Sequence, residues 1–76
     1  MPNEPQPDRV GLSALQRQVL QVSATGASTS EVATRLGMSV DEVREHLAQA
    51  IALLGARSKL EAVIRALRLG LIRLPG

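Results

Sequence analysis

Apolar residues recur along this chain at the three- and four-residue spacing of amphipathic helices, in four separate stretches. The pattern predicts helices at about 14–25, 29–36, 40–54 and 59–69. No stretch shows the alternation of apolar and polar residues that is typical of a half-buried strand. The expected fold is therefore all-α, a compact four-helix domain.

Serine and glycine residues mark the ends of these stretches. Each stretch begins with a serine that is followed three residues later by Glu or Gln, the spacing of a capping box. These pairs are Ser13 with Gln16, Ser28 with Glu31, Ser39 with Glu42, and Ser58 with Glu61. Each stretch is followed by a glycine, which can take the left-handed conformation that ends a helix. The glycines are Gly26, Gly37, Gly55 and Gly70.

The helical spacing also predicts which faces are buried. In the first stretch Leu15, Val19 and Val22 share one stripe and are expected to face the core, with Gln21 outward. In the third stretch the apolar residues fall within one arc of about 100°, so a single polar face is left to solvent. The outward residues there are Asp41, Arg44, Glu45, Ala48 and Ala52.

The fourth stretch carries two apolar arcs on either side of a narrow polar stripe. The first consists of Leu60, Val63, Ile64 and Leu67, and the second of Ala62, Ala66 and Leu69. We expect the first arc to face the core. The second arc then either covers the tail at 71–72 or forms a dimer seam, in which small residues let two copies of the helix approach closely.

Composition limits the chemistry that this chain can perform. It has 76 residues and no Cys, Phe, Tyr or Trp, so its core is aliphatic and disulfides and thiolate metal sites are excluded. The single His46 cannot form a metal site alone, and we expect no cofactor. Residues 1–11 form a Pro-rich arm that we expect to be flexible, with the domain at 12–73. Apolar runs are too short to span a membrane, and a cytoplasmic, nucleoid-associated location is expected.

The formal net charge of +2 hides an uneven distribution. Residues 57–76 carry five basic side chains against Glu61, whereas residues 39–56 carry three acidic side chains against Arg44. The basic end suits a polyanionic partner, and the acidic stretch does not.

The second and third predicted helices have the spacing of a helix-turn-helix. A short helix contains Ala33, which allows a close crossing, and Gly37 lies in the turn. A longer helix follows with Val43 facing inward. In this unit the second helix protrudes from the surface, so that the N-terminal half of that helix can enter a major groove.

From Leu12 to Ile72 the chain resembles, without gaps, the LuxR-type (GerE or NarL/FixJ) DNA-binding domain of bacterial transcription regulators. The resemblance rests on Leu12-Ser13, Val19-Leu20, Gly26, Ser28, Glu31-Val32-Ala33, Leu36, Ser39, Val43-Arg44-Glu45-His46, Leu54-Gly55, Ser58-Lys59, Glu61-Ala62-Val63 and Gly70-Leu71-Ile72. It implies that the third helix reads duplex DNA and that the fourth forms a homodimer. The implied DNA-binding residues are Thr29, Ser30, Asp41, Arg44, Glu45, His46, Ala48 and Lys59, and the expected dimer seam is Ala62, Ala66 and Leu69.

Several positions depart from the pattern of this family, and these departures lower the expected affinity for DNA. Thr29 and Ser30 stand where Asn and then Lys or Arg are usual. Glu42 stands where Thr is usual, and Leu53 where Lys is usual. Exposed Leu53 would be a hint of a contact with protein.

Individual residues of the third helix allow two interpretations. Glu42 is most simply a capping residue. Arg44 contacts a guanine or a phosphate, or else pairs with Asp41 on the surface. Glu45 and Asp41 either accept a hydrogen bond from cytosine or are merely solvated. His46 is either a partly buried core-border residue or a phosphate contact.

The leading functional hypothesis is a bacterial transcription regulator, or its output domain, that binds DNA as a dimer. The alternative is a protein-interaction module whose acidic third helix contacts another transcription factor or a polymerase subunit. An enzyme is not expected, because the chain has no nucleophile–base pair and no glycine-rich phosphate loop. No small-molecule site is evident.

Overall fold

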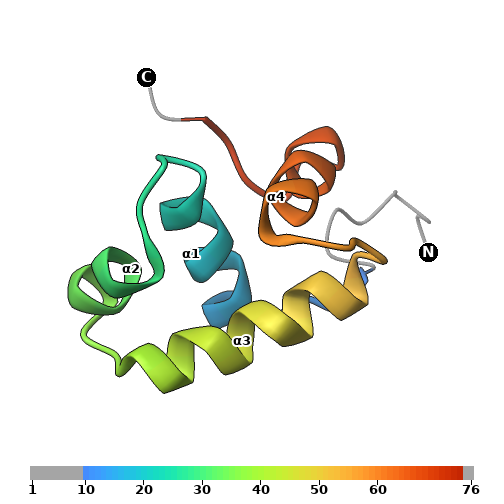
Figure 1. The fold of residues 1–76 in the computed structure, drawn as a ribbon. Helices are drawn as coiled ribbons and strands as arrows, with labels where there is room; N and C mark the ends of the chain where they lie inside the picture. Colours follow the sequence, from blue (N-terminus) through green and yellow to red (C-terminus); the bar gives the residue numbers. More distant parts are fainter. Residues whose placement is uncertain (1–9, 75–76) are drawn as a thin grey trace, which may run out of the picture.

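The computed structural model describes residues 10–74, which form four helices and no strand (Figure 1). The helices are α1 (Ala14–Ser23), α2 (Thr29–Leu36), α3 (Val40–Leu53) and α4 (Lys59–Arg68). The all-α four-helix prediction is confirmed, and α2 has the predicted bounds. The other three helices end one or two residues earlier than predicted, because the last residues before each glycine form turns.

Serine caps begin all four helices, and three of them are complete capping boxes. At Ser13, Ser28 and Ser39 the hydroxyl accepts from the backbone three residues on, and the Gln or Glu side chain accepts from the serine N–H. Ser58 differs, since its φ is −155° whereas the other three lie near −75°. The carboxylate of Glu61 accepts instead from the backbone N–H of Arg57 at 2.6 Å. The prediction of a fourth capping box is therefore wrong.

The turn between α2 and α3 depends on Gly37. This residue adopts a left-handed conformation with φ 66° and ψ 36°. The reversal lets Met38 N donate to Ala33 O at 2.9 Å, which satisfies a carbonyl at the end of α2. Only Met38 and Ser39 then separate this glycine from the start of α3. The two helices are thus joined by the short turn that the sequence predicted.

Helix α1 lies at the centre of the fold and contacts the other three helices (Figure 1). Its buried residues are Gln16, Val19, Leu20 and Ser23. The predicted stripe of Leu15, Val19 and Val22 was therefore rotated, since Leu15 is exposed and Val22 is only half-buried. Because α1 is covered from more than one side, its buried face is broader than a single apolar stripe.

The chain after α4 folds back onto the core. Leu71 and Ile72 are buried. Gln21 holds the following residue by both of its polar groups, accepting from Arg73 N at 3.0 Å and donating to Arg73 O. Gln21, expected to face solvent, is therefore half-buried and fixes the tail.

Helix α4 buries part of each predicted arc: Val63 and Leu67 of the first arc lie in or against the core as predicted, but so do Ala62 and Ala66 of the second. Ala62 and Ala66 are completely buried, whereas Leu60 is 70% exposed and Ile64 is 41% exposed. The assignment of Ala62 and Ala66 to a dimer seam is therefore wrong, while Leu69 lies exposed as expected. Small side chains let the α4 backbone approach α1 and α3 closely, so the alanines pack inside while Leu60 and Ile64 stay on the outer side.

Residues 1–9 of the predicted N-terminal arm lie outside the described residues. The part of the arm that is described begins with Val10, which packs against the core. Gly11 is exposed, and Leu12 is buried. The described chain therefore meets the core two residues before the predicted domain start.

Candidate nucleic-acid interface

The helix-turn-helix is built from α2 and α3. Val32 and Ala33 of α2 and Val43 of α3 are buried, and the two helices are in contact. On its other side α3 runs along the edge of the molecule, with no other described element beneath it in the view of Figure 1. The core thus fixes the inner face of α3 and leaves its outer face free.

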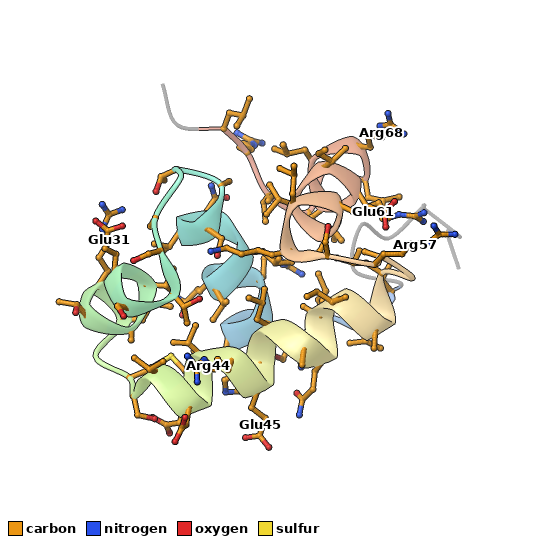
Figure 2. The ribbon with its side chains drawn as sticks, in the orientation of Figure 1. Glu31, Arg44, Glu45, Arg57, Glu61 and Arg68 are labelled. Atoms are coloured by element: carbon orange, nitrogen blue, oxygen red, sulfur yellow. The ribbon has the colours of Figure 1, made fainter. Side chains whose placement is uncertain are left out.

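The outer face of α3 carries the residues that the sequence placed there. Asp41, Arg44, Glu45 and Ala48 are all exposed. Figure 2 shows Glu45 pointing away from the other helices. Within residues 10–74, Arg44 forms no ion pair with Asp41 or with any other carboxylate. The guanidinium is therefore available to a ligand, and the surface pairing considered for Arg44 is not formed.

Glu42 lies at the start of this face and acts as a cap. Its Oε1 accepts from Ser39 N at 2.9 Å, and Ser39 Oγ accepts from Glu42 N at 3.0 Å. These bonds to Ser39, backbone first, lower the pKa of Glu42 from its ordinary value, with a smaller contribution from nearby His46. The capping interpretation is confirmed. The same bonds keep a negative charge beside Asp41 at neutral pH.

His46 borders the core, as its position in the helix indicated. The residue is half-buried, and its Nδ1 atom is buried without a hydrogen-bond partner among residues 10–74. Nδ1 would need to become accessible before it could accept a partner outside the domain. The partly buried interpretation is therefore confirmed, and the phosphate contact stays a prediction.

The three remaining predicted DNA-binding residues lie around the start of α2 and of α4. Ser30 is exposed and Thr29 is half-buried, both in the first turn of α2. The ammonium of Lys59 donates to the carbonyl oxygen of Ala27 at 3.1 Å, so it ties the start of α4 to the loop before α2. An ammonium has three donors, so this bond leaves capacity for another acceptor. Lys59 therefore has a structural role that the sequence did not reveal.

A polar contact between α1 and α3 was not predicted. Gln16 Nε2 donates to Gln49 Oε1 at 2.7 Å. Gln16 was recognised only as a capping residue, and Gln49 was not singled out. Their separation of 33 positions leaves no local pattern that could have revealed the contact.

Charge is divided between two ends of the domain. Near α3, Arg44 lies among Asp41, Glu42 and Glu45, whereas basic residues gather around α4. Figure 2 shows Arg57, Glu61 and Arg68 at the opposite end of the molecule from Glu31, Arg44 and Glu45. The candidate reading surface is thus the more acidic end of the described chain.

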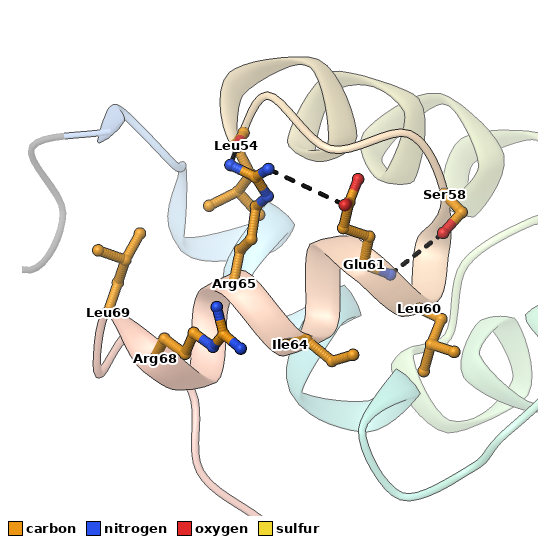
Figure 3. Close-up of a pocket in the computed structure, with 8 residues that line it drawn as sticks. All are labelled: Leu54, Ser58, Leu60, Glu61, Ile64, Arg65, Arg68 and Leu69. Carbon is orange, nitrogen blue, oxygen red and sulfur yellow. Dashed lines mark hydrogen bonds and ion pairs between the residues drawn. The ribbon is translucent and has the colours of Figure 1, made fainter.

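A second exposed surface, the α4 face, lies on the outer side of α4 (Figure 3). We define this face by Leu60, Glu61, Ile64, Arg68 and Leu69. It forms most of an open groove of about 610 Å³. The lining residues are Leu54, Ser58, Leu60, Glu61, Ile64, Arg65, Arg68 and Leu69. This shape is an open apolar surface rimmed by charge, and such surfaces mark sites of protein contact.

Residues 10–74 contain no group of three or more His, Asp or Glu side chains placed to hold a metal ion. No helix in that range has both the length and the apolar character needed to cross a membrane.

A short helix and a glycine turn that hold a longer helix with a free polar face define a helix-turn-helix protein. The family model GerE, described as "Bacterial regulatory proteins, luxR family", matches residues 10–66. The chain belongs to this family and is a DNA-binding domain of transcription regulators, not an enzyme.

Individual relatives agree with this assignment. The chain is 36% identical over 61 residues to the transcriptional repressor ThaA of Burkholderia thailandensis, covering 80% of this chain and 26% of ThaA. It is 32% identical over 63 residues to the spore germination protein GerE of Bacillus subtilis, covering 83% of this chain and 85% of GerE. A solved structure of the transcription factor GerE superposes with a TM-score of 0.79 at 30% identity, over 84% of this chain and 96% of that one. The chain thus spans about a quarter of the length of ThaA but most of that of GerE.

Proposed function

We propose that this chain acts as a bacterial transcription regulator, or as its output domain, by inserting α3 into the major groove of duplex DNA. The observation that carries the proposal is the free outer face of α3, with Arg44, Glu45 and Ala48 exposed, in a chain that belongs to the LuxR family. Such a protein would work in the cytoplasm, on the chromosome.

Each exposed residue of α3 has a chemical role in this proposal. Arg44 donates to the acceptors of a guanine or to a phosphate, while Asp41 and Glu45 accept from the amino group of cytosine. Ala48 is small, so it lets the helix approach the bases and can contact a thymine methyl group. Together they would read a short base sequence, with His46 at the edge of the contact.

Phosphate contacts would come from outside the reading face. Ser30 and Thr29 place hydroxyl groups and the N-terminal turn of α2 at the surface. Lys59 can offer the donors that Ala27 does not use. Because the proposed interface contains few basic side chains, its affinity for DNA should fall less steeply with salt than that of a protein with many phosphate contacts.

The proposed protein is a homodimer that uses the α4 face. Leu60, Ile64 and Leu69 remain exposed in the single chain, and burying them would remove apolar surface from water. A two-fold axis at this face would present two copies of α3 to successive major grooves about one turn apart. The expected site is therefore a palindrome.

In-vitro selection of random duplexes with the purified chain tests the proposal. We expect enrichment of a two-fold symmetric sequence. Anisotropy titrations of the enriched duplex across a salt series would then measure its affinity. Gln18→Ala is a matched control, because Gln18 is exposed on α1 and outside the proposed interface. Failure to enrich any sequence, together with equal binding of unrelated duplexes, would contradict a sequence-reading role.

The alternative is a protein-interaction module. It is favoured by the three carboxylates beside Arg44 and by Leu53, which is 45% exposed at the far end of α3. These features suit a basic surface on another transcription factor or a polymerase subunit. Binding to such a protein with no DNA binding at low salt would favour this function over the first.

A further inference from the structure

The α4 face carries a pattern of charged and apolar residues that is complementary to itself. Leu60 and Leu69 lie near its two ends, and Ile64 lies between them, 70%, 50% and 41% exposed, respectively. Glu61 and Arg68 are separated by two helical turns, so they lie within about 20° of each other around the axis. One helix face therefore offers an acid near its start and a base near its end.

We propose that the α4 faces of two copies pair antiparallel, with Glu61 of each copy bonded to Arg68 of the other. This proposal rests on the proposed homodimer and adds its register and its selectivity. The two-fold axis passes beside the point between Ile64 and Arg65. Each Glu61 then lies opposite an Arg68, and two equivalent ion pairs flank the axis.

The same register places one apolar residue near the two-fold axis. Leu60 and Leu69 are nine positions apart, so they lie on opposite sides of the α4 axis. In an antiparallel pair centred between Ile64 and Arg65, the two copies of Ile64 lie near the two-fold axis, and Leu60 and Leu69 lie at opposite edges of the contact. A parallel pair would instead place Glu61 against Glu61 and Arg68 against Arg68. The charged residues thus select the antiparallel arrangement.

The charges that this pairing needs are available in the single chain (Figure 3). Arg68 forms no ion pair within residues 10–74. One oxygen of Glu61 accepts from Arg57 N at 2.6 Å, and the other has a long contact of 3.9 Å with Arg65, whose side chain is partly exposed like that of Glu61. Arg65 is also turned toward the end of α3, where its guanidinium donates to the carbonyl oxygen of Leu54 at 3.4 Å. Arg68 is therefore the base of the α4 face that has no intramolecular partner in this part of the chain.

The size of the surface explains why the charges would decide its partner. A ten-residue helix with three exposed apolar side chains buries little area, and small interfaces are weak unless electrostatic complementarity favours them. Related chains without an acid and a base at these two positions would pair less well with this one. The ion pairs thus favour self-association over mixed dimers.

Charge reversal with the full chain tests the register. Sedimentation velocity would be run over a concentration series for the wild type, Glu61→Arg, Arg68→Glu, and an equimolar mixture of the two variants. In either variant alone the proposed register sets two like charges opposite each other. In the mixture both contacts become opposite-charge pairs again. We expect each variant alone to dimerise at least about tenfold more weakly than the wild type, and the mixture to recover dimer.

Two matched variants separate pairing from folding. Glu61→Gln keeps an oxygen that can accept from Arg57 N, and we expect it to weaken the dimer without unfolding the domain. Arg35→Glu makes the same charge change as Arg68→Glu but lies on α2, and we expect it to dimerise as the wild type does. Circular dichroism would verify that each variant is folded. Because surface charges are screened, added salt should weaken the wild-type dimer.

The outcomes distinguish the register from the dimer itself. A wild type that dimerises while folded single variants dimerise equally well would overturn the register and leave the α4 seam standing. Recovery of wild-type affinity in the mixture would support the register. A wild type that stays monomeric at every concentration, with and without a selected duplex, would overturn both the dimer and its register. In that case a foreign helix would be the remaining occupant of the face.

Discussion

Gln16 and Gln49, 33 residues apart in the chain, join α1 to α3 through a hydrogen bond of 2.7 Å between their side-chain amides. Gln16 is buried, and its Oε1 also accepts from Ser13 N at 2.9 Å to complete the cap of α1. One amide therefore fixes the start of α1 and holds α3 against it. Because the reading face lies on α3, this bond contributes to the orientation of that face.

Removing either partner of this bond should destabilise the domain, but by different amounts. We expect Gln16→Ala to lower the free energy of unfolding by about 1–3 kcal/mol, since it also removes half of a capping box. Gln49→Ala should cost about 0.5–1.5 kcal/mol, because Gln49 is exposed and water can reach its former partner. Urea unfolding measures both. Gln18→Ala is the control, and equal losses for all three variants would contradict the role of the bond.

Two substitutions on α4 should have opposite consequences. Ile64→Glu changes a residue of the α4 face, so we expect loss of the dimer with little change in the stability of the monomer. Ala66→Glu would bury an unpaired charge at a completely buried position and should cost about 3–5 kcal/mol or prevent folding. Thermal unfolding and light scattering distinguish the two effects. A folded, stable Ala66→Glu variant would contradict the packing of α4.

Arg44 is the basic residue on the outer face of α3, and its removal should weaken specific DNA binding. We expect Arg44→Ala to cost about 1–3 kcal/mol on the selected duplex. If Arg44 contacts a guanine, replacing that guanine in the duplex should weaken binding of the wild type but should change binding of Arg44→Ala little. If it contacts a phosphate, the loss should be the same for all sequences. Anisotropy titrations measure both, and an unchanged affinity would remove Arg44 from the interface.

Two capping carboxylates predict a loss of stability in acid. The pKa values of Glu31 and Glu42 lie below the ordinary 4.5, chiefly because the backbone N–H groups of Ser28 and Ser39 bond to the ionised forms. A lowered pKa stabilises the fold fully above pH 4.5, and this contribution is lost as the pH falls through the folded-state value. The melting temperature should therefore decrease as the pH is lowered below 4.5.

A charge-removing variant tests this origin of the acid sensitivity. Glu42→Gln keeps an acceptor for Ser39 N but has no charge to titrate, so its melting temperature should depend less on pH than that of the wild type. Glu45→Gln is the matched control, because it removes a charge from α3 without removing a cap. Parallel acid profiles for the wild type and Glu42→Gln would show that this cap does not contribute.

Most of the fold could be predicted from local signals. The serine caps and the glycines after each apolar stretch define where helices begin and end, because capping depends on residues only three or four positions apart. The outward position of Asp41, Arg44, Glu45 and Ala48 also followed from helical spacing. Their contact with bases remains a prediction. The fourth capping box failed because the backbone before α4 turns Arg57 N, rather than Ser58 N, toward Glu61.

Contacts between distant residues could not be predicted in the same way. Lys59 was assigned to DNA because of its charge, yet its ammonium is bonded to the carbonyl oxygen of Ala27. Gln16 was expected only to cap a helix, yet it is buried against α3. Each of these bonds depends on how two helices approach each other, and no periodicity in one helix contains that information.

The sequence by itself determined four capped helices, the turn at Gly37 and the free polar face of α3, because each is fixed by neighbours within a few residues. Only the tertiary structure decided which residues of the two apolar arcs of α4 face inward. Periodicity makes the two arcs equivalent, and greater hydrophobicity favoured the arc with Leu60 and Ile64. Close packing against α1 and α3 instead brought Ala62 and Ala66 inside beside Val63, since small side chains let the helix backbones approach. Leu60 and Ile64 were thereby left on the surface, where a second copy can bury them.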